Sequence, residues 1–346
     1  MYKGFLVDKG LLESDPHFAQ GCSLCHQGDE SARTREAAHK GLVKRPSDDL
    51  NTCGGCHEEI AGNYKNSLHY TSAGQRHGVM PRFSVKDLKA FDAHVFEKSC
   101  RSCHASCGDC HVKSPTIGGV STGLLKGHSF VRKDEGKTCA RCHGGRVYPE
   151  FTGEYGGTPD VHYEKGMSCA DCHSKGEFHG EGGPYTSRRD VKGRPACINC
   201  HPAGQEKKAK AKTAHALHAG KASCTSCHSS GSYRNCYSCH EGPGSTSKPG
   251  FFLGRNPRDG KTLTTLRLIP TIKDTFAESG ITMDNFDKLP NYWDAYPHNI
   301  KKRTNRTRSC NACHVEGKDF LTEEMLIKDG SKANKELIMV PKQLKK

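Results

Sequence analysis

The residues of this chain best suited to chemistry are its twenty cysteines, all of which fall in ten short motifs of the form Cys-x-x-Cys-His. Paired cysteines at this spacing can form disulfides, bind zinc, act as a redox dithiol or attach a haem covalently. The residues around the pairs must distinguish these chemistries. The cysteines are Cys22 and Cys25, Cys53 and Cys56, Cys100 and Cys103, Cys107 and Cys110, Cys139 and Cys142, Cys169 and Cys172, Cys197 and Cys200, Cys224 and Cys227, Cys236 and Cys239, and Cys310 and Cys313.

The histidine that follows every pair separates these alternatives. Histidine makes up only 21 of 346 residues, so ten accidental placements directly behind cysteine pairs are ruled out. Disulfides need no histidine, and a zinc site needs two pairs spaced to close one tetrahedron. A c-type haem needs this pattern, because two thiols bond one porphyrin and the next histidine binds its iron. We therefore predict ten covalent haems with proximal ligands His26, His57, His104, His111, His143, His173, His201, His228, His240 and His314.

The sixth iron position decides the function. An iron with two strong axial ligands transfers electrons, whereas an open face can bind a substrate. Eleven histidines lie outside the motifs, one more than ten bis-histidine haems require, and we expect the surplus among His17, His215 and His218. Methionine is the rival ligand type, but the internal methionines are better explained by packing. The predicted distal ligands are His17, His39, His69, His77, His94, His128, His162, His179, His215, His218 and His298.

The composition predicts a fold of mostly irregular coil with short α-helices and very little β-structure, built around haems. Without its cysteines, the apolar share of the chain falls from 34% to about 28%, which is low for this length. Thirty-eight glycines and 16 prolines oppose long regular elements. We expect helices near residues 48–70, 85–104 and 204–220. Because few apolar side chains are available, we expect no folded state without haem.

The spacing of the motifs predicts three segments. Residues 1–99 hold two haems, residues 100–245 hold a dense array of seven, and residues 246–346 hold one. In the stretch "CRSCHASCGDCH" at 100–111, two motifs follow so closely that their haems must be neighbours. The haem-free stretch 251–309 contains the only tryptophan and is expected to wrap the surface and bring His298 to a haem. A docking face for an acidic redox partner is the alternative for this stretch.

The charge and the termini bear on partners and location. The polypeptide has a net charge of +14; about twenty haem propionates, offset by about +1 on each of ten ferric porphyrin cores, bring the oxidised protein to about +4. We therefore expect the basic residues to pair with propionates and expect no nucleic-acid partner. No apolar run reaches the length of a transmembrane segment, and the N-terminus does not resemble a secretion signal. Since haem is attached to this class outside the cytoplasmic membrane, we expect a signal to have been removed and the protein to be periplasmic, extracellular or at the cell surface.

The sequence resembles the multihaem (decahaem) c-type cytochromes of bacteria and archaea that respire metals, minerals, sulfur compounds or partner cells. The motifs from 22 to 314 carry this resemblance, together with the stretches "VHYEKGMSCADCH", "GEFHGEG" and "TAHALHAGKASCTSCH". The resemblance implies low-potential bis-histidine haems in a near-contiguous chain. It also implies periplasmic or extracellular electron transfer to other redox proteins or cytochromes.

Three functions remain open at this point. The favoured one is a non-enzymatic electron carrier of periplasmic or extracellular respiration. The second is a subunit of an extracellular cytochrome filament, or nanowire, in which copies of the chain are partners. The third is a multihaem reductase of small nitrogen or sulfur oxyanions, which would require an iron with an open distal face.

Overall fold

A computed structural model of the chain describes residues 9–113, 116–117, 120–121, 129–130, 136–154, 157–229 and 250–343. The predicted haem residues Cys236, Cys239 and His240 and the predicted ligand His128 lie outside the described residues. The chain divides into two compact units, each built from separate stretches of sequence. Unit 1 takes in the described parts of Met1–Ala73, Cys103–Thr138 and Ser174–Gly193; unit 2 takes in those of Gly74–Ser102, Cys139–His173 and Arg194–Lys346.

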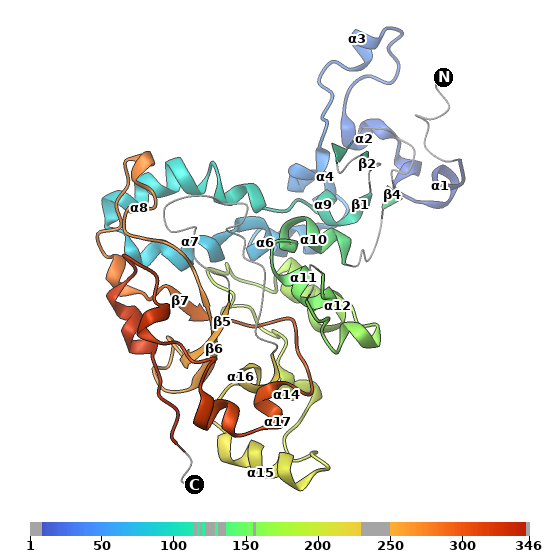
Figure 1. Ribbon diagram of the computed structural model, residues 1–346. Helices are drawn as coiled ribbons and strands as arrows, with labels where there is room; N and C mark the ends of the chain where they lie inside the picture. Colours follow the sequence, from blue (N-terminus) through green and yellow to red (C-terminus); the bar gives the residue numbers. More distant parts are fainter. Residues whose placement is uncertain are drawn as a thin grey trace. The chain divides into compact units, whose positions relative to one another are not determined.

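Unit 1 consists of short helices and two small strand pairs (Figure 1). The strand β1 (Val112–Lys113) pairs with β4 (Ser129–Phe130), and β2 (Thr116–Ile117) pairs with β3 (Val120–Ser121), both antiparallel. The helices are α1 (Lys9–Ser14), α2 (Cys22–His26), α3 (Arg35–Ala38), α4 (Leu50–Gly54), α5 (Glu58–Tyr64), α6 (Leu68–Thr71), α9 (Cys107–His111) and α13 (Lys175–His179).

Unit 2 combines further short helices with a three-stranded antiparallel sheet (Figure 1). The sheet has the order β5 (Phe251–Arg255), β6 (Leu263–Leu268), β7 (Tyr292–Asp294), and Leu266 pairs with Phe252 on one side and Asp294 on the other. The helices lying wholly or mostly in this unit are α7 (Ala73–Val79), α8 (Val85–Phe91), α10 (Lys137–His143), α11 (Val147–Thr152), α12 (Cys169–Cys172), α14 (Cys197–Cys200), α15 (Ala209–His218), α16 (Cys224–His228) and α17 (Asn305–Arg308).

The predicted fold class of short helices, coil and little β-structure is confirmed. The predicted helix at 48–70 is instead three helices, α4 to α6, because Asp49 and Ser67 each cap a new N-terminus and Ser72 ends α6 in the left-handed region. The predicted helix at 85–104 is shorter, since α8 passes into a single π turn at Asp92–Phe96. Among the described residues, no helix combines the length and apolarity needed to span a lipid bilayer.

Unit 2 has side-chain cores that the composition did not predict. Leu266, Leu268, Tyr292, Leu321 and Leu337 form one buried cluster on the sheet. A second cluster gathers aromatic and aliphatic side chains of the α7–α8 region and of residues 281–286; its buried members are Phe83, Phe91, Phe96, Ile281, Met283 and Phe286. The expectation that 251–309 only wraps the surface is therefore wrong. The alternation of apolar residues in "LTTLRL" is the signal for a half-buried strand.

A buried arginine ties the second cluster together. The guanidinium of Arg82 is only 1% exposed and donates to the carbonyl oxygens of Phe286 (2.9 Å) and Pro290 (2.7 Å). It also lies 4.7 Å from the ring centroid of Phe286, a cation–π contact. Burial lowers the pKa of Arg82 to about 10, so the side chain stays protonated at neutral pH. This residue fixes the 286–290 segment that leads into β7.

The sheet core of unit 2 should contribute to stability independently of haem. Leu266→Ala removes a fully buried side chain, and we expect a loss of about 3 kcal/mol in the free energy of unfolding, measured by denaturant titration with far-UV circular dichroism. The control is Val340→Ala, whose side chain is 85% exposed and whose effect should stay within about 0.5 kcal/mol. Equal stabilities for the two variants would mean that the haems alone hold this unit.

Candidate haem-binding sites

Most of the described motifs lie on short helical turns, which place the two cysteines of a pair on one face with the histidine directly after. The Cys53 motif instead runs past the end of α4, and the Cys310 motif leads into a π turn at Ala312–Glu316. No disulfide joins the described cysteines. In two motifs the aspartate before the second cysteine closes a capping box. Asp109 Oδ2 accepts from the backbone N–H (2.8 Å) and hydroxyl (3.0 Å) of Ser106, and Asp171 does the same for Ser168.

Among the described residues, six pairs of imidazoles face each other at nearly the same spacing. In every pair one histidine belongs to a motif and the other does not. The two ring centroids of each pair are 5.9–6.3 Å apart. The pairs are His57 with His17, His111 with His179, His201 with His162, His173 with His298, His228 with His215, and His314 with His218.

This spacing fits a metal ion between the rings. A metal–nitrogen bond of about 2 Å puts the centroids of two imidazoles on opposite sides of one ion about 6 Å apart. Rings in direct van der Waals contact would lie closer when stacked. The geometry therefore matches an iron with one proximal and one distal histidine, and the cysteines beside each motif histidine provide the covalent anchors.

In nine of the described histidines a hydrogen bond holds the ring nitrogen Nδ1 and leaves Nε2 for a metal, whereas the buried Nδ1 of His298 has no hydrogen-bond partner among the described residues. Acceptors fix the tautomer and orientation of ligating histidines in this way. Six of these bonds go to backbone carbonyls and three go to carboxylates. The carbonyl acceptors are Val43 for His26 (2.8 Å), Arg35 for His39 (2.8 Å), Lys175 for His179 (3.1 Å), Ala214 for His218 (2.7 Å), Lys301 for His228 (3.1 Å) and Lys342 for His314 (2.6 Å).

Burial keeps several of these imidazoles neutral, which is the form that binds iron. It lowers the pKa of His298 to about 3. It also lowers the pKa values of His143, His179 and His228 below the ordinary value of histidine. At neutral pH these rings offer lone pairs rather than positive charges.

Contacts between cysteines show which motifs are neighbours. In unit 1 a thiol hydrogen bond joins Cys53 and Cys107, and it lowers the pKa of Cys107 to about 7. In unit 2 a similar bond joins Cys197 and Cys224. Haems attached at such positions would be neighbours. The sequence did not reveal these neighbours, because other stretches of chain separate the two motifs in each case.

The six pairs leave four motif histidines and five others to be assigned. The expected surplus ligands His17, His215 and His218 each face a motif histidine, so the structure does not support them as the surplus. The motif histidines outside the six pairs are His26, His104, His143 and His240. The other histidines outside them are His39, His69, His77, His94 and His128.

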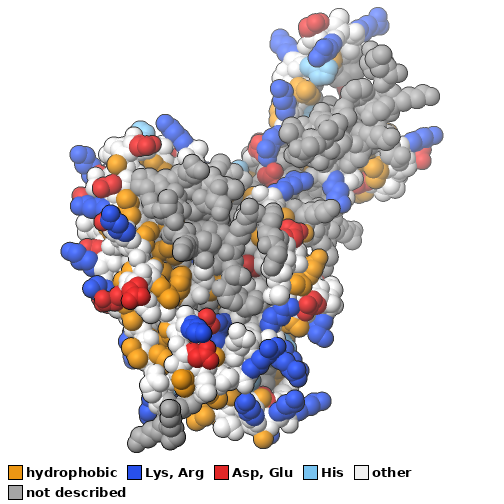
Figure 2. Space-filling view, viewed as in Figure 1, with side chains coloured by type: hydrophobic (Ala, Val, Ile, Leu, Met, Phe, Trp, Pro, Cys, Tyr) orange, Lys and Arg blue, Asp and Glu red, His pale blue; other side chains and the backbone are white. Residues whose placement is uncertain are grey.

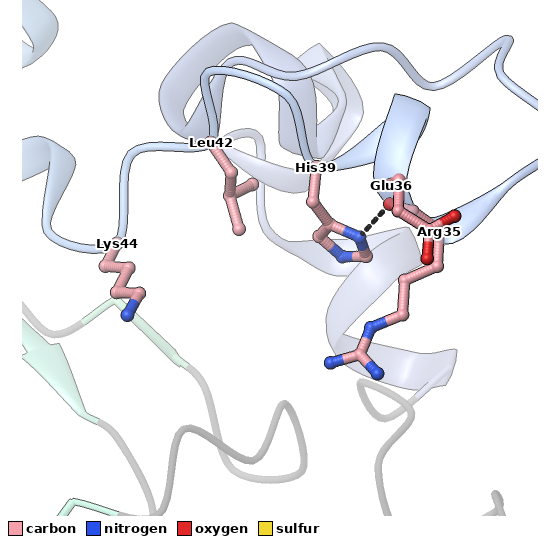
Figure 3. A pocket seen from close by; sticks show the side chains of 5 residues that line it. All are labelled: Arg35, Glu36, His39, Leu42 and Lys44. Carbon is pink, nitrogen blue, oxygen red and sulfur yellow. Dashed lines mark hydrogen bonds between the residues drawn. The ribbon is translucent and has the colours of Figure 1, made fainter.

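A cavity of about 470 Å³ lies beside His39 in unit 1 (Figure 3). Arg35, Glu36, Leu42 and Lys44 complete its lining. The volume lies in the range of cofactor pockets, and the two basic side chains suit the carboxylates of a propionate-bearing ligand. His26 of the first motif donates to Val43, next to Lys44 on the loop that borders this cavity. His39 lines this cavity and stays a predicted distal ligand.

Comparison with known proteins agrees with this geometry. Residues 161–241 match the family model of cytochrome c3. The matched stretch contains four Cys-x-x-Cys-His motifs and four non-motif histidines, His162, His179, His215 and His218. No curated protein and no solved structure matches the chain. The match supports a multihaem c-type cytochrome with covalently bound haem and an electron-transfer role.

Proposed function

We propose that the protein carries electrons along a chain of ten c-type haems with bis-histidine ligation. The observation that carries this proposal is the set of six imidazole pairs, each spaced for one iron. The haem, when bound, supplies an iron that accepts and releases one electron. The cysteines would anchor it, and the two histidines of each of the six pairs would bind its iron, which would leave those irons without a site open to a substrate.

The proposed path runs between haems brought together by the motif contacts. The Cys53–Cys107 contact places two attachment sites together in unit 1, and the Cys197–Cys224 contact does so in unit 2. The motifs at 100–111 add a further neighbouring pair on sequence grounds. Along the chain, the proposed haems are distributed unevenly: two in residues 1–99, seven in residues 100–245 and one in residues 246–346.

The proposed setting is periplasmic or extracellular respiration, with other redox proteins or cytochromes as partners. On the face drawn in Figure 2, Lys and Arg side chains are spread over the surface with acidic groups between them. Such a distribution is suited to pairing with haem propionates rather than to forming one continuous basic face.

The number of haems should be ten. Intact-mass spectrometry and pyridine haemochrome absorbance of the purified holoprotein should both give ten haems per chain. The double variant C236A/C239A should carry nine, because it removes one motif and leaves the others intact. Fewer than ten haems in the wild-type protein would contradict the proposed cofactor content.

Removing one distal histidine should open one iron. In His162→Ala, the haem of the Cys197 motif would keep only His201, so one haem should become high-spin in the ferric protein and bind carbon monoxide when reduced. Tyr163→Ala is the control, since this neighbouring side chain is 44% exposed and not a ligand in the proposal.

The wild-type protein and the control should remain low-spin and bind neither carbon monoxide nor nitrite. Substrate binding by the wild-type protein would instead favour a reductase. An unchanged spectrum for His162→Ala would show that His162 is not an iron ligand.

A further inference from the structure

Three of the facing imidazoles differ from the rest in what accepts their Nδ1 proton. His17 donates to Asp15 (2.8 Å), His162 to Asp160 (2.8 Å) and His215 to Glu206 (2.5 Å). Each of these acceptors is a carboxylate, whereas the other described Nδ1 bonds of this kind go to neutral carbonyl oxygens. Each of the three histidines faces a motif histidine.

Two of these contacts have the same local construction. In Asp15-Pro16-His17 and in Asp160-Val161-His162, one carboxylate oxygen accepts both the backbone N–H and the Nδ1–H of the histidine two residues later. Asp160 is only 2% exposed, and its second oxygen accepts from the backbone N–H of Ile300 (2.7 Å). The carboxylate is therefore fixed in position and shielded from water.

Spacing in the sequence alone does not produce this contact. The pattern Asp-x-His occurs five times, and in the other three cases the carboxylate is engaged elsewhere. Asp92 forms a two-bond ion pair with Arg76, at 2.6 and 2.8 Å. Asp109 and Asp171 cap the helices of their own motifs. At Asp92, therefore, the Asp-x-His pattern accompanies an ion pair rather than the contact made at His17 and His162.

We propose that Asp15, Asp160 and Glu206 lower the reduction potentials of the three haems whose distal ligands they orient. This inference rests on the proposed bis-histidine ligation. A carboxylate acceptor draws the Nδ1 proton and makes the imidazole a stronger electron donor to iron. Ferric iron carries one more positive charge than ferrous iron, so it gains more from the stronger donor and from the nearby negative charge.

The consequence is an uneven potential profile within each unit. In unit 2 the motifs of Cys197 and Cys224 touch, and both would hold a haem with a carboxylate-bonded distal histidine. These two haems would have lower reduction potentials than the haems whose histidines bond to carbonyls. Electrons would therefore reside on those other haems. In unit 1 the haem of the Cys53 motif would lie below its neighbour at Cys107, whose distal ligand His179 bonds to a carbonyl.

The test is a spectroelectrochemical titration of the holoprotein with Glu206→Gln and Asp160→Asn. In both variants the new amide keeps a carbonyl oxygen for the histidine and removes the charge; in Asp160→Asn the amide nitrogen also replaces the oxygen that accepts from Ile300. In each variant we expect one haem's share of the absorbance change to move to higher potential while the rest stays in place. The ferric electron paramagnetic resonance signal of the same haem should shift within its low-spin range, as a weaker donor requires.

Asp171→Asn is the matched control, because it removes one negative charge two residues before the motif histidine His173, and the described bonds of Asp171 go to Ser168. Its shift should be smaller than those of the two test variants. The inference is overturned if the titration curves of Glu206→Gln and Asp160→Asn overlay the wild-type curve or shift no more than the control. In that case, low-spin spectra would still leave the proposed ligation standing. High-spin wild-type spectra would overturn both. Should Asp160→Asn fail to fold, Glu206→Gln decides the matter, since Glu206 accepts no other described side-chain bond.

Discussion

We propose that the coordination of iron between two imidazoles is the interaction on which the folded holoprotein depends. Each of the six pairs joins a motif histidine to a histidine from another part of the chain, as with His173 and His298. Such a pair has little reason to form without a metal, because two neutral rings about 6 Å apart share no hydrogen bond and only weak dispersion. With iron between them, the pair becomes a cross-link that closes a long loop, and binding free energy becomes folding free energy.

The two units differ in how far they depend on this cross-linking. In unit 2 a sheet and two apolar clusters bury Leu266, Tyr292, Ile281 and Met283 completely. In the described part of unit 1, the buried apolar side chains are few, chiefly Tyr64 and Tyr185. Since a small unit with little apolar burial cannot offset its chain entropy, unit 1 must take most of its stability from haem. Unit 2 has a scaffold of its own to which haems are added.

The sequence predicted the attachment chemistry and the fold class because both follow from local patterns. Ten motifs define their own ligands, and low apolar content with many glycines and prolines limits the secondary structure. The ligand pairs could not be predicted, because a distal histidine such as His298 reaches its partner through long-range packing. The sheet of β5, β6 and β7 was missed although the pattern of β6 signals a strand, because β7 has only three residues and lies 24 positions after β6. The Asp-x-His pattern at Asp15 and Asp160 is only a weak signal for a carboxylate–imidazole contact, because Asp92 in the same pattern pairs with Arg76 instead.

The most direct test of the account is an experimental structure of the holoprotein at a resolution that shows the axial ligands. We expect each of the six pairs, from His17 with His57 to His218 with His314, to share one haem iron, with Nε2 of both rings about 2 Å from it. The account is contradicted if any of these irons is bound by methionine, lysine or water in place of the facing histidine, or if the two histidines of a pair bind different irons.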